Sequence, residues 1–295
     1  MTMTEAPPYI GRHQRFALVG STNDVVRSWL AAGEPEVCLA VADEQTAGRG
    51  REGRTWTAPP GTALLLSLGF RPTWLEPSRV WQLAAIVSLA MAEAAEVVAD
   101  LPARTVRLKW PNDLVVERDG ETLKLAGVIG ETDGLGSAHP MAVVGIGVNA
   151  DWAREDFPPQ LAPTMTSLRE VAGRPVDREL LLDRFLARVD VRSRALRMGS
   201  FDANGWSARQ LTTGRLVRLD LPSGQSEVVR AMRADPMTGA LIVEDPAHPG
   251  GREVVSGDVH HLRFEPGADA APTTRADANA GADQSAGADS NAKDV

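Results

Sequence analysis

The stretch from residue 62 to residue 149 repeats one pattern, in which short apolar runs end at turn residues. Arg118, Asp119 and Gly120 form one such turn, of the kind that closes a β-hairpin. Consecutive strands joined by short turns pair antiparallel. The runs expected to form strands are residues 62–70, 105–110, 114–117, 123–131 and 141–149. The chain is therefore predicted to be an α+β protein with a mixed, mostly antiparallel sheet and flanking helices.

A change of character after residue 208 indicates a second, smaller module. The earlier part holds helical periodicity at 77–99 and 177–198, whereas 209–264 shows only short strand-like runs between Pro, Gly and Ser turns. Residues 265–295 contain six acidic and two basic residues and no large apolar residue before the last position, so we expect disorder there. The predicted divisions are an N-terminal segment at 1–13, a main domain at 14–208, a small β domain at 209–264 and a tail at 265–295.

Composition excludes several classes of protein. The net charge of -8 argues against DNA as the main partner, because duplex-binding proteins present a broad basic face. One cysteine cannot form an internal disulfide, and the five histidines form no zinc-binding pattern. The most apolar stretch, 81–99, carries two glutamates, and the N-terminus lacks the features of a signal peptide. We expect a cytoplasmic protein that does not enter membranes.

Residues 43–56 form the most unusual segment, because Arg49, Arg51 and Arg54 alternate there with glycines. Glycine allows a backbone to approach a ligand closely, and arginine offers forked donors to carboxylates and phosphates. Trp56 can stack on a purine. A flexible solvated loop and an RNA contact are the alternatives. The position between two buried strands favours an ordered binding loop.

The run Lys109-Trp110-Pro111-Asn112-Asp113 is also unusual, because it places polar groups between two apolar strands. Taken alone it is typical of a turn or bulge. Lys124 begins the partner strand, so it can face the same site as Asp113, although an exposed edge lysine is the commoner case. Ser21-Thr22-Asn23 reads on its own as a helix cap. The strand 145–149 contains two glycines but lacks the third glycine and the helix of a dinucleotide site.

Together and in order, these segments resemble the biotin protein ligase family over residues 14–264. The matching residues are 21–23, Gln45 with 48–56, 109–113, 124–127 and 145–149. The resemblance implies that 14–208 is a catalytic domain related to class II aminoacyl-tRNA synthetases and that 209–264 is an SH3-like barrel. It also implies that the chain is monofunctional, because the matching segment begins too early to leave room for an N-terminal DNA-binding domain.

The resemblance assigns roles residue by residue. Biotin or its activated carboxyl group would be bound by Ser21, Thr22, Asn23, Gln45, Arg49, Gly50, Arg51 and Lys124. ATP and the adenylate would be bound by Arg49, Arg51, Arg54, Trp56, Asn112 and Asn149, with Trp56 against the adenine. Lys109, Asp113, Lys124 and Arg51 are the predicted catalytic residues. Asp113 is a candidate to orient or deprotonate the acceptor amine, because the second step needs a neutral lysine. The metal ligands stay unassigned.

The implied reaction uses ATP, biotin and Mg²⁺. Biotin is activated to biotinyl-5′-AMP and then transferred to a lysine of the biotin carboxyl carrier domain of an acyl-CoA or pyruvate carboxylase, by a monomer or weak homodimer that binds no specific DNA. The arginine-containing loop would order over the intermediate as a lid. Three alternatives remain open at this point: a lipoate ligase, a biotin-sensing repressor and a non-catalytic RNA-binding module.

Overall fold

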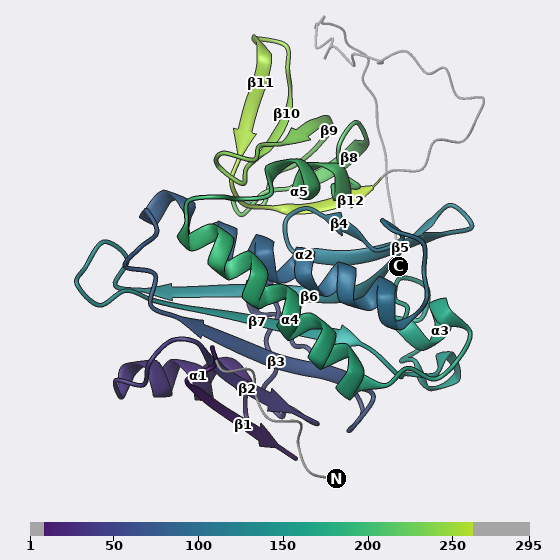
Figure 1. Cartoon of the computed structure of the whole chain (residues 1–295). Coiled ribbons are helices and arrows are strands. Elements are labelled where there is room, and N and C mark those ends of the chain that lie inside the picture. Colours follow the sequence, from purple (N-terminus) through teal and green to yellow (C-terminus); the bar gives the residue numbers. More distant parts are fainter. Residues whose placement is uncertain (1–8, 262–295) are drawn as a thin grey trace, which may run out of the picture. The chain divides into compact units, whose positions relative to one another are not determined.

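A computed structural model describes residues 9–261 of the chain, so the predicted tail at 265–295 lies outside the described residues. Its largest element is a seven-stranded sheet with the strand order β1-β2-β3-β7-β6-β5-β4 (Figure 1). β1 runs parallel to β2, and the other neighbouring strands pair antiparallel. The predicted α+β class with an antiparallel-dominated sheet is confirmed. The strands are β1 (Arg12–Phe16), β2 (Cys38–Ala42), β3 (Ala63–Phe70), β4 (Arg107–Lys109), β5 (Asp113–Arg118), β6 (Glu121–Asp133) and β7 (Met141–Asn149).

Helices cover both faces of this sheet, which explains why every residue of β2 and β3 is buried. α1 (Thr22–Ala31) packs on one face, where Val26 and Leu30 contact Cys38 and Ala40. The opposite face packs against α2 (Trp81–Val98) and α4 (Arg178–Arg197), which lie side by side (Figure 1). Two short helices, α3 (Leu168–Ala172) and α5 (Ala203–Arg209), complete this part of the chain. β1, α3 and α5 were not predicted.

The segment Pro77–Val98 is long and apolar enough to cross a membrane, but 72% of its apolar window is buried inside the fold. A core helix of this kind meets the same length and composition test as a membrane span, so the segment is weak support for one. The predicted continuous helix at 77–99 begins instead with a separate 3-10 turn at Pro77–Arg79, and the α-helix starts at Trp81.

The second sheet has five strands in the order β11-β10-β9-β8-β12. Its strands lie within 209–264, where the sequence shows only short strand-like runs. The bounds are β8 (Leu216–Asp220), β9 (Ser226–Ala234), β10 (Leu241–Asp245), β11 (His248–Val254) and β12 (Asp258–His261). The described residues form one compact unit, and the predicted domain boundaries at 14, 208 and 264 stay predictions.

A buried ion pair fixes α2 to α5. Arg209 donates from both Nη atoms to the Glu96 carboxylate, at 2.7 and 2.9 Å. The same two side chains also satisfy the backbone hydrogen-bonding groups of Val106. Its N–H donates to Glu96, and its carbonyl accepts from Arg209. Since neither charge reaches water, the loss of one partner would leave the other unpaired in the core.

Candidate active site

A cavity of about 320 Å³ lies on the α1 face of the large sheet. This size is typical of small-molecule sites, which occupy about 300–1,000 Å³. All fourteen residues that the sequence singled out line it, and their roles remain predictions. These residues are Ser21, Thr22, Asn23, Gln45, Arg49, Gly50, Arg51, Arg54, Trp56, Lys109, Asn112, Asp113, Lys124 and Asn149.

One end of the cavity is a buried polar network at the start of α1. Gln45 Oε1 accepts hydrogen bonds from the backbone N–H and the hydroxyl of Thr22, at 2.7 and 2.9 Å. The hydroxyl of Ser67, in the middle of β3, lies 2.7 Å from Thr22 Oγ1 and 2.5 Å from Asn23 Oδ1. In the described part of the chain, no acceptor reaches Asn23 Nδ2. This buried donor is therefore available to a ligand oxygen.

Ser21 occupies the N-cap position of α1, but its side chain makes no capping hydrogen bond. The run therefore does begin a helix, as predicted, and its three side chains are also buried beside the cavity. Sequence reasoning missed Ser67. The sequence feature that could have identified it is a single hydroxyl in an otherwise apolar strand. A buried hydroxyl needs a hydrogen-bond partner, so it indicates polar neighbours.

The glycines of β6 and β7 make space for the side chains above them. A Cβ at Gly145 would lie 2.2 Å from Asn23 Oδ1, and one at Gly147 would lie 2.6 Å from the Trp56 ring. Gly127 pairs with Gly147 across the two strands, so the indole rests on a floor without side chains. The residues that superficially resembled a nucleotide-binding fingerprint therefore serve close packing.

The loop of residues 48–56, here called the arginine loop, is an ordered hairpin. The Gly50 N–H donates to the Arg54 carbonyl at 2.6 Å, and the Trp56 N–H donates to the Gly48 carbonyl at 2.9 Å. Glu52 and Gly53 turn the chain with φ angles of 55° and 73°. This hairpin agrees with the predicted ordered binding loop better than with the alternative of a flexible, solvated loop.

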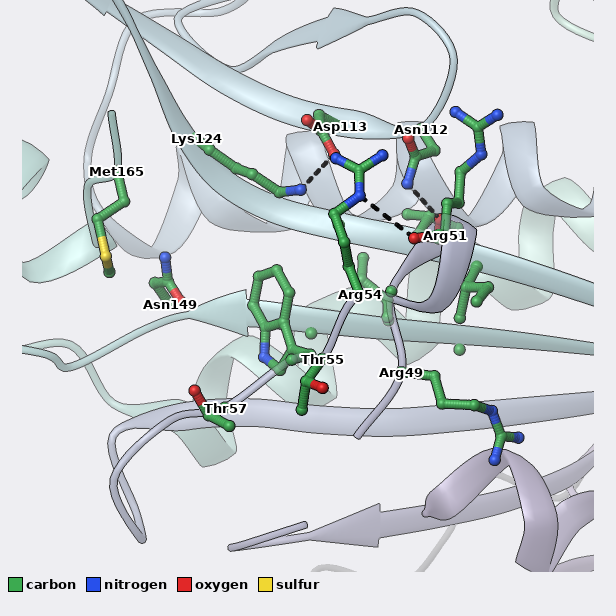
Figure 2. Close-up of a pocket in the computed structure, with 18 of the residues that line it drawn as sticks. Arg49, Arg51, Arg54, Thr55, Thr57, Asn112, Asp113, Lys124, Asn149 and Met165 are labelled. Atoms are coloured by element: carbon green, nitrogen blue, oxygen red, sulfur yellow. Dashed lines mark hydrogen bonds and ion pairs between the residues drawn. The ribbon is translucent and has the colours of Figure 1, made fainter. Parts of the chain in front are cut away.

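Arg49 points away from the middle of the cavity, toward α1 (Figure 2). It makes a bidentate ion pair with Asp24, at 2.7 and 2.8 Å, and a second ion pair with Glu131 at 3.1 Å. The hydrogen bonds from Arg49 lower the pKa of the Asp24 carboxyl. Arg49 therefore fastens the arginine loop to α1 and β6, a contact that the sequence did not predict.

Arg51 and Arg54 reach a turn of the second sheet instead. Arg51 donates to the carbonyl of Gly257 at 3.2 Å and to the Ser256 hydroxyl at 3.4 Å. Arg54 forms an ion pair with Asp258, and Arg51 lies 3.7 Å from the same carboxylate. Asp258 also lines the cavity. Sequence reasoning missed it, because Ser-Gly-Asp at a strand start is typical of an ordinary turn.

Lys124 and Asp113 meet across the β5–β6 hairpin, with Lys124 Nζ 2.7 Å from Asp113 Oδ1 (Figure 2). A bulge between Leu114 and Val115 shifts the strand register, which pairs Asp113 with Gly127 and Val115 with Lys124. Lys124 also lies 5.6 Å from the centre of the Trp56 ring, within cation–π range. The prediction that Lys124 faces the same site as Asp113 is confirmed.

The remaining lining residues surround these charges. Burial lowers the pKa of Lys109, although the nearby Asp113 carboxylate opposes this shift. Asn112 Nδ2 donates to the Val128 carbonyl at 3.0 Å, and Asn149 Nδ2 donates to the Thr166 carbonyl at 3.0 Å. Apolar walls come from Trp152, Leu161 and Met165, which sequence reasoning did not identify.

Comparison with known proteins identifies the family. Residues 16–149 match the profile of the biotin/lipoate A/B protein ligase family. A biotin–acetyl-CoA-carboxylase ligase of Mycobacterium tuberculosis is 35% identical over 252 residues, which cover 84% of this chain and 88% of that protein. The chain belongs to the biotin protein ligase family. The recognition made from the sequence is confirmed.

Solved structures of the family agree with this assignment. Biotin protein ligase from Aquifex aeolicus, in complex with biotin and ATP, matches with a TM-score of 0.69 at 25% identity and covers 86% of this chain and 99% of that one. The Leishmania major ligase, in complex with biotinyl-5-AMP, matches with a TM-score of 0.55 at 28% identity and covers 88% and 100%. The bifunctional ligase/repressor of Bacillus spizizenii is 30% identical, over 63% of this chain and 55% of its own length.

Proposed function

We propose that this ligase activates biotin with ATP and transfers it to a lysine of a biotin carboxyl carrier domain. The observation that carries the proposal is one cavity that joins a buried polar network to a cluster of cations. The Mycobacterium relative bears the name of this activity, and the Aquifex relative was solved with biotin and ATP. Among the two ligase types in the family profile, these names favour biotin over lipoate.

The two ends of the cavity suit the two substrates. Thr22, Asn23 and Gln45 offer hydrogen-bonding groups to a compact polar head, such as the ring system of biotin. Trp56 lies on the glycine floor near Lys124 and is proposed to stack on adenine. Ser21 and Gly50 complete the proposed biotin end, and Asn112 and Asn149 the proposed adenylate end.

In the first step a biotin carboxylate oxygen attacks the α-phosphorus of ATP. The bond to the bridging oxygen of the β-phosphate breaks, and pyrophosphate leaves with that electron pair. Two unit charges 4 Å apart repel by about 4 kcal/mol at an effective dielectric constant of about 20. Arg51, Arg54 and Lys124 are the cations placed to offset this repulsion. Protein carboxylates pair with all three cations in the structure, so substrate anions would replace these carboxylates as the partners of the cations.

In the second step the neutral amine of a carrier lysine attacks the acyl carbon of the adenylate. The carbon–oxygen bond to the phosphate breaks and AMP leaves. A free lysine has a pKa of about 10.4, so the attacking amine must lose a proton before or during attack. Asp113 is proposed to orient that amine or accept its proton, with Lys124 holding the carboxylate and Lys109 beside it.

Magnesium is proposed to enter with the nucleotide. The described residues contain no group of three or more His, Cys, Asp or Glu side chains that would hold a metal ion. Residues 9–261 therefore offer no such cluster for a resident magnesium ion, and the ion would depend mainly on phosphate oxygens and water. The residue roles above do not depend on it.

The large sheet is proposed to be of the class II aminoacyl-tRNA synthetase type, with boundaries at 14 and 208, and the five-stranded sheet to be an SH3-like barrel at 209–264. The acceptor is proposed to be the carrier domain of an acyl-CoA or pyruvate carboxylase. We further propose a cytoplasmic enzyme, monomeric or weakly dimeric, without specific DNA binding.

The proposal is tested with the purified chain, ATP and magnesium. Mass spectrometry should detect biotinyl-adenylate when biotin is added, together with pyrophosphate, and should detect no adenylate of lipoate at equal concentration. A carrier domain added afterwards should gain the mass of biotin on one lysine. Preferential formation of lipoyl-adenylate would favour the lipoate ligase alternative and overturn the proposal.

A further inference from the structure

The turn between β11 and β12 contacts the arginine loop. It presents three acceptors in a row, here called the seat: the Ser256 hydroxyl, the Gly257 carbonyl and the Asp258 carboxylate. Arg51 binds all three groups and Arg54 binds the last. Both arginine side chains and Asp258 line the cavity. The seat and the loop therefore close one side of the site together.

We propose that Asp258 is a positioning residue that holds the arginine loop over the bound adenylate. This inference rests on the proposed function. Asp258 acts through Arg51 and Arg54, and it contacts no reacting atom. The second sheet thereby takes part in retaining the intermediate. No residue of this sheet was predicted from the sequence to have such a role.

The charge balance of the site supports this role. Four cations line one cavity together with the Asp113 and Asp258 carboxylates. These cations are Arg51, Arg54, Lys109 and Lys124. The triphosphate of ATP would supply negative charge to these cations during the first step. When pyrophosphate leaves, the adenylate keeps only one phosphate charge, and the arginines need another partner. Asp258 is a carboxylate already fixed on the backbone beside both of them.

The geometry of the seat allows Arg54 to exchange repeatedly between Asp258 and a substrate phosphate. Asp258 is 23% exposed and Arg51 is 21% exposed, whereas Arg54 is 56% exposed. Arg54 can therefore leave Asp258 for a phosphate and return without repacking the core. Arg51 has two further acceptors in Ser256 and Gly257, so the loop stays near the seat while Arg54 moves.

The test measures release of the intermediate separately from its formation. The full-length parent and Asp258→Asn are loaded with radiolabelled biotin and ATP, and free biotinyl-adenylate is followed after rapid dilution. We expect release to rise up to about fivefold in Asp258→Asn, because a charge-assisted but partly exposed contact contributes about 1 kcal/mol at most. Pyrophosphate formation should change by a smaller factor. Asp258→Glu, which keeps the charge, should recover most of the retention.

A matched control comes from the same sheet. Asp245 is a similarly exposed acid that pairs with His248 at the β10–β11 turn and does not line the cavity. Asp245→Asn should release the intermediate like the parent. A merely structural role for Asp258 would raise release in both variants or leave Asp258→Glu as leaky as Asp258→Asn, and either result would overturn the inference.

A double substitution shows whether Asp258 acts through the loop. If it does, Asp258→Asn combined with Arg54→Gln should raise release by less than the product of the two single effects. Fully multiplicative effects would contradict the inference. A parent chain that makes no adenylate at all would instead refute the proposed function, so the two failures are distinguishable.

Discussion

Replacement of Gly147 by alanine tests whether the Trp56 floor is the nucleotide site. The new Cβ would lie 2.6 Å from Trp56 Cε2 and 2.7 Å from its Nε1, whereas carbon atoms pack best at about 3.5–4.0 Å. The indole must therefore move upward into the space proposed for adenine. Overpacking of this kind costs about 1–3 kcal/mol, equivalent to roughly 5- to 150-fold in binding. We expect the KM for ATP to rise at least fivefold.

Gly130 provides the matched control, because it lies on β6 and a Cβ there would meet no atom within 4 Å. The assay is pyrophosphate release at saturating biotin for the parent, Gly147→Ala and Gly130→Ala, with thermal unfolding measured in parallel. Only Gly147→Ala should raise the KM for ATP. Equal KM values in the two variants would refute the placement of adenine on Trp56.

Three further predictions concern the core, the pH response and the buried polar network. Glu96→Gln should lower the free energy of unfolding by about 3–5 kcal/mol in denaturant titrations, because it leaves Arg209 buried without its counter-charge; a loss under 1 kcal/mol would contradict the structure. Burial lowers the pKa of His261 to about 3, below its ordinary value of about 6.5, so its contribution to stability is present above pH 6.5 and is lost as the pH falls toward 3. The melting temperature of His261→Gln should accordingly fall less over that interval than that of the parent, and parallel curves would sink this assignment. Ser67→Ala should raise the KM for biotin about five- to tenfold with little change in the KM for ATP, because it removes the hydroxyl that supports Thr22; an unchanged biotin KM would exclude that support.

Periodicity predicted most of the large sheet because its central strands are buried on both faces and read as continuous apolar runs. β1 escaped prediction for the opposite reason. Its sequence, Arg-His-Gln-Arg-Phe, has one apolar residue, and it becomes a strand only by pairing in parallel with β2 at the sheet edge. A tertiary contact, absent from the local pattern, decides its structure.

The candidate site was predictable where its residues lie in dense local motifs. The sequence could not predict which acid each arginine contacts. Arg49 pairs with Asp24 and Glu131, residues that no spacing rule connects to it. Asp258 is separated from Arg54 by 204 residues and resembles a common turn residue. Side chains brought together by the folding of distant segments leave no mark in either local sequence.

A crystal structure with a non-hydrolysable biotinyl-adenylate analogue would test the central claim most directly, that cations gathered around one cavity allow two anions to react. The account predicts that Lys124 and at least one of Arg51 and Arg54 lie within hydrogen-bonding distance of the acyl-phosphate atoms, with the adenine on Trp56. An analogue bound outside this cavity, with none of these three cations near its acyl-phosphate atoms, would contradict it.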